Sequence, residues 1–176
     1  MGNEQGPVDA GLSSLRRGGL SIVVFRIGLA IANTVIDQAY GSALAPGRWH
    51  SLRIGASPRR VIYTAGTRAL AQLEKRVHAN GIAPIGQALL RVTLPDGLAV
   101  ATAESMGLPI HWRDSEAVTQ AFGDRWLDSA AELALWVPSY VEPSEHNLLI
   151  NVEHPRLSEV TLLAERDPFE FDPRLM

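Results

Sequence analysis

Two arginines stand at positions where a cation needs a partner. Arg26 ends a short apolar run, residues 21–26, and burying a guanidinium is costly unless a carboxylate or an anionic ligand neutralises it. Arg48 lies in a Gly-Arg-Trp turn, where glycine lets a ligand approach the backbone and the guanidinium can hold a phosphate through two hydrogen bonds. The alternatives are a structural ion pair for Arg26 and stacking of an exposed Arg48 on Trp49.

A carboxylate and a hydroxyl are the other two candidates. Glu74 lies at the edge of the apolar stripe expected for its helix, which indicates a carboxylate that is either paired or functional. His78, one helical turn further on, offers the simple pairing. Ser139 follows Val137-Pro138 at the end of a predicted strand and, taken alone, indicates only a turn. A chemical role for either residue therefore needs support from the rest of the sequence.

The other common catalytic signatures are missing from the sequence. It contains no P-loop, no G-x-G-x-x-G after a strand, no H-E-x-x-H and no G-x-S-x-G. The five histidines lack the spacing of metal ligands, so we expect no metal site. The chain has no cysteine, which excludes disulfides, thiolate metal sites and cysteine nucleophiles and is compatible with a reducing cytosol.

Composition and charge favour a cytoplasmic domain that does not bind nucleic acid. A chain of 176 residues that is 46% hydrophobic and 20% charged is typical of one globular domain. The net charge is −3 and the basic residues are scattered, which argues against binding duplex DNA. Residues 20–36 are largely apolar and follow Arg16-Arg17 as in a signal peptide, but Arg26 and Asn33 would make insertion into a membrane costly. We therefore expect neither export nor a membrane span.

Periodicity and turn signals predict the elements that must position these residues. Strands are expected at residues 21–26, 60–64, 87–93, 98–102, 133–137, 147–151 and 159–163, with the third and fourth around a turn at Pro95-Asp96-Gly97. One helix begins at the N-cap Thr67 and ends near Asn80-Gly81. Its expected core stripe is Leu70, Leu73 and Val77.

The remaining segments complete the predicted domain. A second helix, residues 112–131, is expected to be interrupted by Gly123. Residues 28–39 predict one or two helical turns, and residues 40–58 a long ordered loop of the kind that is often functional. Residues 1–19 are polar and rich in glycine, which predicts a flexible tail ahead of one domain, residues 20–176. Because strands outnumber helices and the two are interspersed, we predict an α+β or mixed α/β fold.

Eight short motifs follow one another along the chain in an order that resembles a known family. They are Gly47-Arg48-Trp49, Val61-Ile62-Tyr63-Thr64, Leu73-Glu74, Gly123-Asp124-Arg125-Trp126-Leu127, Val137-Pro138-Ser139, Asn147-Leu148-Leu149-Ile150-Asn151, His154-Pro155 and Phe169-Glu170-Phe171-Asp172-Pro173-Arg174-Leu175. The resemblance, from Val23 to Leu175, is to the RES-domain family, named for Arg, Glu and Ser residues. Two positions depart from it: His50 and Val152 stand where the family commonly has asparagine and proline.

The resemblance implies a fold, a substrate and a partner. Members of the family are toxins of bacterial toxin–antitoxin pairs, act on NAD+, and have a fold similar to the catalytic domains of ADP-ribosylating toxins. Some degrade NAD+ by hydrolysis or phosphorolysis, and others transfer its ADP-ribose to a protein. The implied partner is a cognate antitoxin, often with a helix-turn-helix region, that covers the active cleft. The implied site is Arg26, Arg48, Tyr63, Glu74 and Ser139, with NAD+ as the substrate and no metal.

The chemistry of NAD+ gives each of these residues an expected role. Glu74 would stabilise positive charge on the ribose, and Arg26 and Arg48 would hold the pyrophosphate. Tyr63 would stack on nicotinamide, and Ser139 would bind a ribose hydroxyl or the carboxamide, or hold Glu74 in place, without acting as a nucleophile. We predict cleavage at the nicotinamide–ribose bond, by water or phosphate, ahead of ADP-ribosyl transfer to a protein acceptor. A non-catalytic binding module is the third interpretation.

Overall fold

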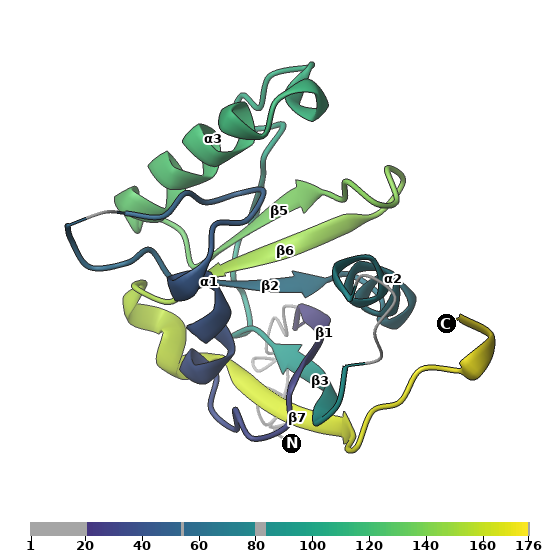
Figure 1. Cartoon of the computed structure of the whole chain (residues 1–176). Helices are drawn as coiled ribbons and strands as arrows, with labels where there is room; N and C mark the ends of the chain where they lie inside the picture. The colour runs from purple at the N-terminus through teal and green to yellow at the C-terminus, as the bar shows by residue number, and fades with distance from the viewer. Residues whose placement is uncertain (1–20, 54, 80–83, 176) are drawn as a thin grey trace, which may run out of the picture.

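The chain builds one mixed sheet with helices laid against it (Figure 1). The computed structural model describes residues 21–53, 55–79 and 84–175, so the tail predicted for residues 1–19 and the helix end predicted at Asn80-Gly81 lie outside the described residues. Seven strands pair in the order β4-β5-β6-β2-β1-β3-β7. Every pair is antiparallel except the parallel pair of β4 and β5. The prediction of a mixed α/β fold is confirmed.

The element bounds agree with most of the predicted segments. The strands are β1 (Val23–Leu29), β2 (Val61–Ala65), β3 (Gln87–Thr93), β4 (Ala101–Thr102), β5 (Ala134–Pro138), β6 (His146–Asn151) and β7 (Thr161–Arg166). The α-helices are α1 (Tyr40–Leu44), α2 (Arg68–His78) and α3 (Glu116–Ser129), and short 3-10 helices cover Ile36–Ala39, Trp112–Asp114, Pro155–Glu159 and Pro173–Leu175. Within the described residues, no helix is both long and apolar enough to cross a membrane.

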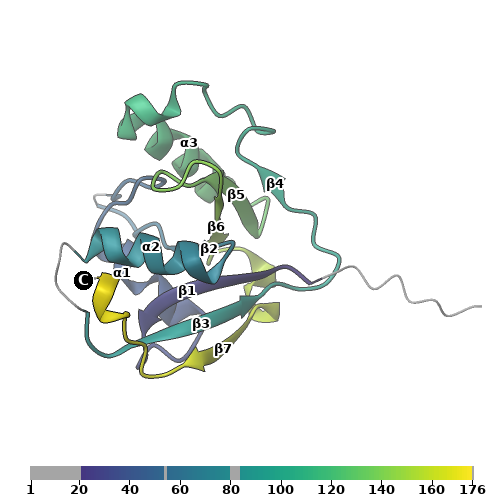
Figure 2. The same ribbon diagram turned by 90° about the vertical axis from the view of Figure 1, so that its right-hand side faces the viewer.

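Helix α2 begins as predicted, but its expected core stripe is wrong. The Thr67 hydroxyl accepts a hydrogen bond from the backbone N–H of Leu70 at 3.0 Å, which satisfies one free donor of the first turn. Leu70 is buried, whereas Leu73 is 41% exposed and Val77 is 51% exposed. The helix lies over β1 and β2 (Figure 2) and contacts the sheet through Leu70 and Ala71. The next apolar positions are therefore turned away from the core.

Two expectations about the chain around helices α1 and α3 are also wrong. The predicted loop of residues 40–58 begins with the helix α1. Gly123 does not interrupt α3, which runs through it. A Cβ atom at Gly123 would lie 1.9 Å from the carbonyl oxygen of Trp49, so this position requires glycine because the loop backbone approaches the helix closely.

The two strands expected around the Pro95-Asp96-Gly97 turn do not pair with each other. Gly97 has a φ of +68°, as a tight turn requires. The strand that follows is only Ala101–Thr102, and it pairs with β5 at the opposite end of the sheet from β3. A turn signal predicts a change of direction, and the partner of the following strand is decided by tertiary packing.

The sheet opens between β1 and β2, and this opening places the site. The only registered pair between these strands is Phe25 with Ala65, so the group β4-β5-β6-β2 diverges from the group β1-β3-β7 (Figure 1). Each group has its own apolar packing. Helix α3 packs Phe122 and Trp126 against the first group, and α2 packs Leu70 near Phe25 of the second. A cavity lies between the two.

Candidate active site

One cavity gathers four of the five predicted site residues. Its volume is about 640 Å³, within the range of about 300–1,000 Å³ that is typical of small-molecule sites. Arg26 from β1, Tyr63 from β2, Glu74 from α2 and Arg48 from the loop after α1 all line it. Ser139 is 0% exposed and does not line the cavity.

The Glu74 carboxylate is held in place by two side chains from the other half of the fold. Its Oε1 atom accepts a hydrogen bond from Ser139 Oγ at 2.9 Å and from Asn147 Nδ2 at 2.6 Å. The pairing of Glu74 with His78, which the helical spacing offered, is absent from the contacts of the described residues. Because two donors fix one oxygen, the carboxylate is oriented before a ligand binds.

Ser139 reaches the site through Glu74. Its hydroxyl donates to Glu74 and accepts hydrogen bonds from the backbone N–H groups of Val141 and Glu142, at 3.1 and 3.0 Å. A hydroxyl that is buried and bonded in this way has no free approach to a ligand. Of the roles expected for Ser139, the geometry favours holding Glu74 in place.

Asn147 is a site residue that we did not identify from the sequence. Its Nδ2 atom holds Glu74, and its Oδ1 atom is buried with no hydrogen-bond partner among the described residues. Asn147 opens the motif Asn147-Leu148-Leu149-Ile150-Asn151, to which no chemical role was assigned, and its partner lies 73 positions earlier in the chain. This oxygen is an acceptor that the described residues leave unsatisfied.

We expect Asn147→Ala to lower turnover about tenfold, with a smaller change in KM. The variant leaves Glu74 with one of its two donors, and a hydrogen bond to a charged group is worth about 1.5–3 kcal/mol. Steady-state kinetics of NAD+ consumption test this, with the exposed Asn33→Ala as the matched control. Unchanged turnover in Asn147→Ala would show that Asn147 does not position Glu74.

Arg26 bridges the opening between β1 and β2. Its Nη1 atom donates to the backbone carbonyl oxygen of Tyr63 at 2.7 Å, and its Nε atom donates to Gln38 Oε1 at 3.1 Å. Burial lowers the pKa of Arg26 to about 10, so the guanidinium still carries its charge at neutral pH. No ion pair to Arg26 is found among the described residues, and the structural ion pair considered for it is therefore not observed.

A second cation lies close to Arg26. Lys75 lines the same cavity, next to Glu74 on α2, and its side chain is partly buried. Burial and, to a lesser extent, the positive charge of Arg26 lower the pKa of Lys75. Both observations indicate a cavity wall that favours an anion.

Arg48 rests on a tyrosine that lies far away in the sequence. Its Cζ atom is 3.7 Å from the centroid of the Tyr140 ring. The alternative, stacking of Arg48 on Trp49, is not observed. Trp49 is only 3% exposed and packs against Trp112 and Phe122. The Nη1 atom of Arg48 is buried without a hydrogen-bond partner in the described part of the chain. Such an unsatisfied donor is costly unless a ligand engages it.

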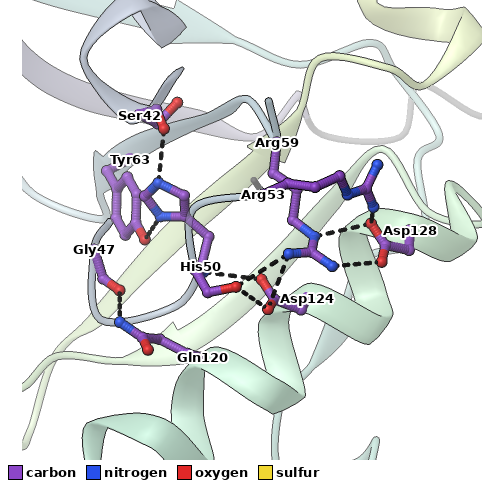
Figure 3. A network of polar contacts seen from close by, with 10 residues as sticks. Ser42, Gly47, His50, Arg53, Arg59, Tyr63, Gln120, Asp124 and Asp128 are labelled. Carbon is purple, nitrogen blue, oxygen red and sulfur yellow. Dashed lines mark hydrogen bonds and ion pairs between the residues drawn. The ribbon is translucent and has the colours of Figure 1, made fainter. Parts of the chain in front are cut away.

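Helix α3 braces the loop that carries Arg48 (Figure 3). Gln120 Nε2 donates to the carbonyl oxygen of Gly47 at 3.1 Å, just before Arg48. Asp124 accepts from the backbone N–H of Ser51 at 3.0 Å and from its hydroxyl at 2.5 Å. Arg59 pairs with Asp124 at 3.1 Å and so joins the far end of the loop to the same helix. The loop is thereby held on both sides of Arg48.

Tyr63 lines the cavity, and its hydroxyl lies against the His50 ring (Figure 3). The hydroxyl oxygen accepts from the N–H of Trp49 at 3.1 Å and lies 2.8 Å from Nδ1 of His50. The Nε2 atom of His50 faces the carbonyl oxygens of Ser42 and Ala45, at 2.9 and 3.1 Å. We infer that the proton is on Nε2 and that Nδ1 accepts from Tyr63. Burial raises the pKa of Tyr63.

His50, a departure from the family pattern, thus has a structural explanation. Its ring is 2% exposed and ties Tyr63 to the end of α1. Gly47 is required beside it, because a Cβ atom there would lie 2.7 Å from the Tyr63 hydroxyl oxygen and 3.0 Å from the His50 ring. The turn, the tyrosine and α1 form one braced unit.

The fold and the cavity define a single-domain mixed α/β protein whose site suits a phosphorylated ligand. An oriented carboxylate and a guanidinium with an unsatisfied donor face one space. Residues 23–172 match the family described as the RES domain, and the chain belongs to that family.

Named relatives agree with this family, and one solved structure has a similar fold. The chain is 36% identical to the "Prs ADP-ribosylating toxin" of Sphingobium sp. (strain YBL2), over 77% of this chain and 84% of the relative. It is 32% identical to the "Toxin Res" of Yersinia enterocolitica, over 77% and 88%. A chain in the crystal structure of the M. tuberculosis MbcT–MbcA toxin–antitoxin complex has a similar fold, with a TM-score of 0.63, 18% identity, and coverage of 90% of this chain and 88% of that one.

Proposed function

We propose that the chain is the toxin of a toxin–antitoxin pair and cleaves NAD+ at the bond between nicotinamide and ribose. The names of its relatives, "Toxin Res" and "Prs ADP-ribosylating toxin", support this class of protein. The observation that carries the chemistry is the Glu74 carboxylate, held by Ser139 and Asn147 at the wall of a cavity that also contains guanidinium groups.

Glu74 would act electrostatically on the reacting ribose. Loss of nicotinamide passes through a state that resembles an oxocarbenium ion, as in glycoside hydrolysis. A fixed anion beside the ribose stabilises that state more than the ground state, because the positive charge develops only as the bond breaks. Both hydrogen bonds from Ser139 and Asn147 go to Oε1 of Glu74, so Oε2 would be the oxygen that faces the ribose, and no covalent enzyme intermediate would be required.

The cations of the cavity would hold the pyrophosphate. Arg48 has a buried Nη1 donor without a partner, and Arg26 and Lys75 line the same cavity. Guanidinium groups bind phosphate oxygens through directed hydrogen bonds. The ring of Tyr63 also lines the cavity and would stack on nicotinamide.

We expect Arg48→Ala to raise the KM for NAD+ at least tenfold and to change turnover less. The guanidinium would bind the pyrophosphate equally in the ground state and the transition state, and loss of such binding raises KM. Initial rates over a range of NAD+ concentrations test this. Arg174→Ala, whose side chain is 89% exposed and pairs only with Asp172, is the control. A fall in turnover at unchanged KM would contradict the pyrophosphate role.

Transfer of ADP-ribose to a protein is the second candidate function. The name of the Sphingobium relative favours it. Three arginines in or next to residues 40–58 could help to dock a protein acceptor, but the structure gives this little support. Arg53 and Arg59 pair with Asp128, and Arg60 pairs with Glu153, so all three are occupied within the fold. With no acceptor surface indicated by these residues, we keep degradation of NAD+ as the first candidate.

A label on the adenylate half of NAD+ distinguishes the two candidates. The purified protein is incubated with labelled NAD+ in a lysate of a sensitive cell. Free ADP-ribose or its phosphorylated form, without labelled protein, supports degradation, and the two products separate attack by water from attack by phosphate. One discrete labelled protein band supports transfer instead. Glu74→Gln is the inactive control, which should give almost no free ADP-ribose and no labelled protein.

A toxin of this kind needs an inhibitor in the cell that makes it. We propose a cognate antitoxin with a helix-turn-helix region that covers the cavity, and the protein in the MbcT–MbcA complex shows the same fold beside an antitoxin. Expression of the chain alone should arrest growth, and co-expression with the neighbouring gene product should relieve the arrest. Binding of that product without loss of NAD+ turnover would contradict the covering of the cavity.

A further inference from the structure

Tyr140 is the ring against which the Arg48 guanidinium rests. The distance of 3.7 Å from Arg48 Cζ to the ring centroid is well inside the range of about 6 Å for a cation–π interaction. The Nη1 atom of Arg48 has no hydrogen-bond partner among the described residues. The ring therefore restrains the guanidinium without occupying that donor.

The position of Tyr140 is fixed by the turn that carries it. Its carbonyl oxygen accepts from Arg113 Nη2 at 2.7 Å, and Trp112 packs edge-on against its ring at a centroid distance of 6.2 Å. The backbone N–H groups that follow it, of Val141 and Glu142, donate to Ser139 Oγ. Tyr140 is 44% exposed and lines the cavity. The contacts of its carbonyl and its ring hold it in place before a ligand binds.

This one turn therefore contacts two of the charged groups of the proposed site, Glu74 and Arg48. Ser139 donates to Glu74, and Tyr140, the next residue, contacts Arg48. The carboxylate and the guanidinium come from different elements, α2 and the loop after α1. Adjacent residues of the turn thus set the relative placement of the two charges.

We propose that Tyr140 is a positioning residue for binding of NAD+, because its ring holds the Arg48 guanidinium, with its unpaired Nη1 donor, at the cavity where the pyrophosphate would bind. The proposal rests on the proposed function and deepens it. A restrained guanidinium loses less conformational entropy on binding than a mobile one. Removal of the ring should therefore weaken binding and leave the chemistry of bond cleavage nearly unchanged.

Three variants test the role of the ring by steady-state kinetics. Tyr140→Leu should raise the KM for NAD+ about tenfold, with turnover within about twofold of the wild type. Tyr140→Phe should restore most of the lost affinity, because it keeps the aromatic face and lacks only the hydroxyl. In an Arg48→Ala background, Tyr140→Leu should cause no further rise in KM, because the ring then no longer holds the cation that binds the ligand; the Arg113 guanidinium, 4.4 Å from the ring centroid, lies outside the cavity lining.

Two results would overturn the proposal. One is a wild-type KM in Tyr140→Leu. The other is a full additional rise in KM in the Arg48→Ala background, which would mean that the ring contacts the ligand directly. Circular dichroism confirms that each variant is folded.

A binding measurement separates failure of this proposal from failure of the proposed function. Titration calorimetry with inorganic pyrophosphate needs no turnover. Weaker binding in Tyr140→Leu than in the wild type and Tyr140→Phe supports the positioning role, even if the wild type leaves NAD+ intact. Equal binding in all three proteins overturns it, whereas a wild type that does not consume NAD+ contradicts only the proposed function.

Discussion

Replacing Glu74 with glutamine is expected to lower turnover of NAD+ by about a hundredfold or more while the protein stays folded. This is the usual cost of losing one preorganised electrostatic group at a reacting centre. Glutamine has nearly the same shape, and its amide oxygen can still accept from Ser139 and Asn147 at the position of Oε1. The change therefore removes the negative charge and leaves most of the packing.

The comparison that decides this prediction is between Glu74→Gln and Glu104→Gln. Glu104 is exposed and lies outside the cavity, so its variant should turn over NAD+ as the wild type does. Steady-state rates and thermal melting are measured on all three proteins. Near-full turnover in Glu74→Gln would mean that another group stabilises the transition state.

Replacing Gly123 with alanine is expected to lower the free energy of unfolding by about 3 kcal/mol, or to lower the Tm by about 10 °C for a domain of this size. The added Cβ would lie 1.9 Å from the carbonyl oxygen of Trp49 and 2.9 Å from its carbonyl carbon. Both atoms belong to the backbone, so no side-chain rotation relieves the contact. The loop that carries Arg48 must move, and the KM for NAD+ should rise as well.

Gly41→Ala is the matched control for this prediction. Gly41 is also a helical glycine, in α1, and a Cβ atom there meets nothing within 4 Å. Because alanine favours helix more than glycine does, the Tm of Gly41→Ala should stay the same or rise slightly. Equal melting temperatures for the two variants would contradict the close approach of α3 to the loop.

Local signals in the sequence identified the strands and the start of α2. The β-branched runs of β1 and β2 and the Thr67 cap follow from propensity and capping alone and are confirmed. The prediction that Leu73 and Val77 lie in the core was wrong, because an amphipathic stripe does not distinguish a face that packs on the core from one turned away from it. The prediction that Gly123 interrupts its helix was wrong, because a glycine that breaks a helix and one that lets a neighbouring backbone approach look the same in the sequence.

The candidate site could be predicted only in part. Arg26, Arg48 and Glu74 were conspicuous because each is a charge beside apolar or turn residues, and the structure brings them to one cavity. Asn147 and Tyr140 gave no comparable signal, because each acts on a residue more than 70 positions away in the chain. Such residues are recognised only when the fold shows what they contact.

The most direct measurement is mass spectrometry of NAD+ after incubation with the purified protein, with and without cell lysate. We expect free nicotinamide to appear in a one-to-one ratio with the NAD+ that is lost, and Glu74→Gln to release almost none. Intact NAD+ in both samples would contradict the proposed function. So would AMP and nicotinamide mononucleotide as the products, because they would place cleavage at the pyrophosphate and leave Glu74 without a role at the ribose.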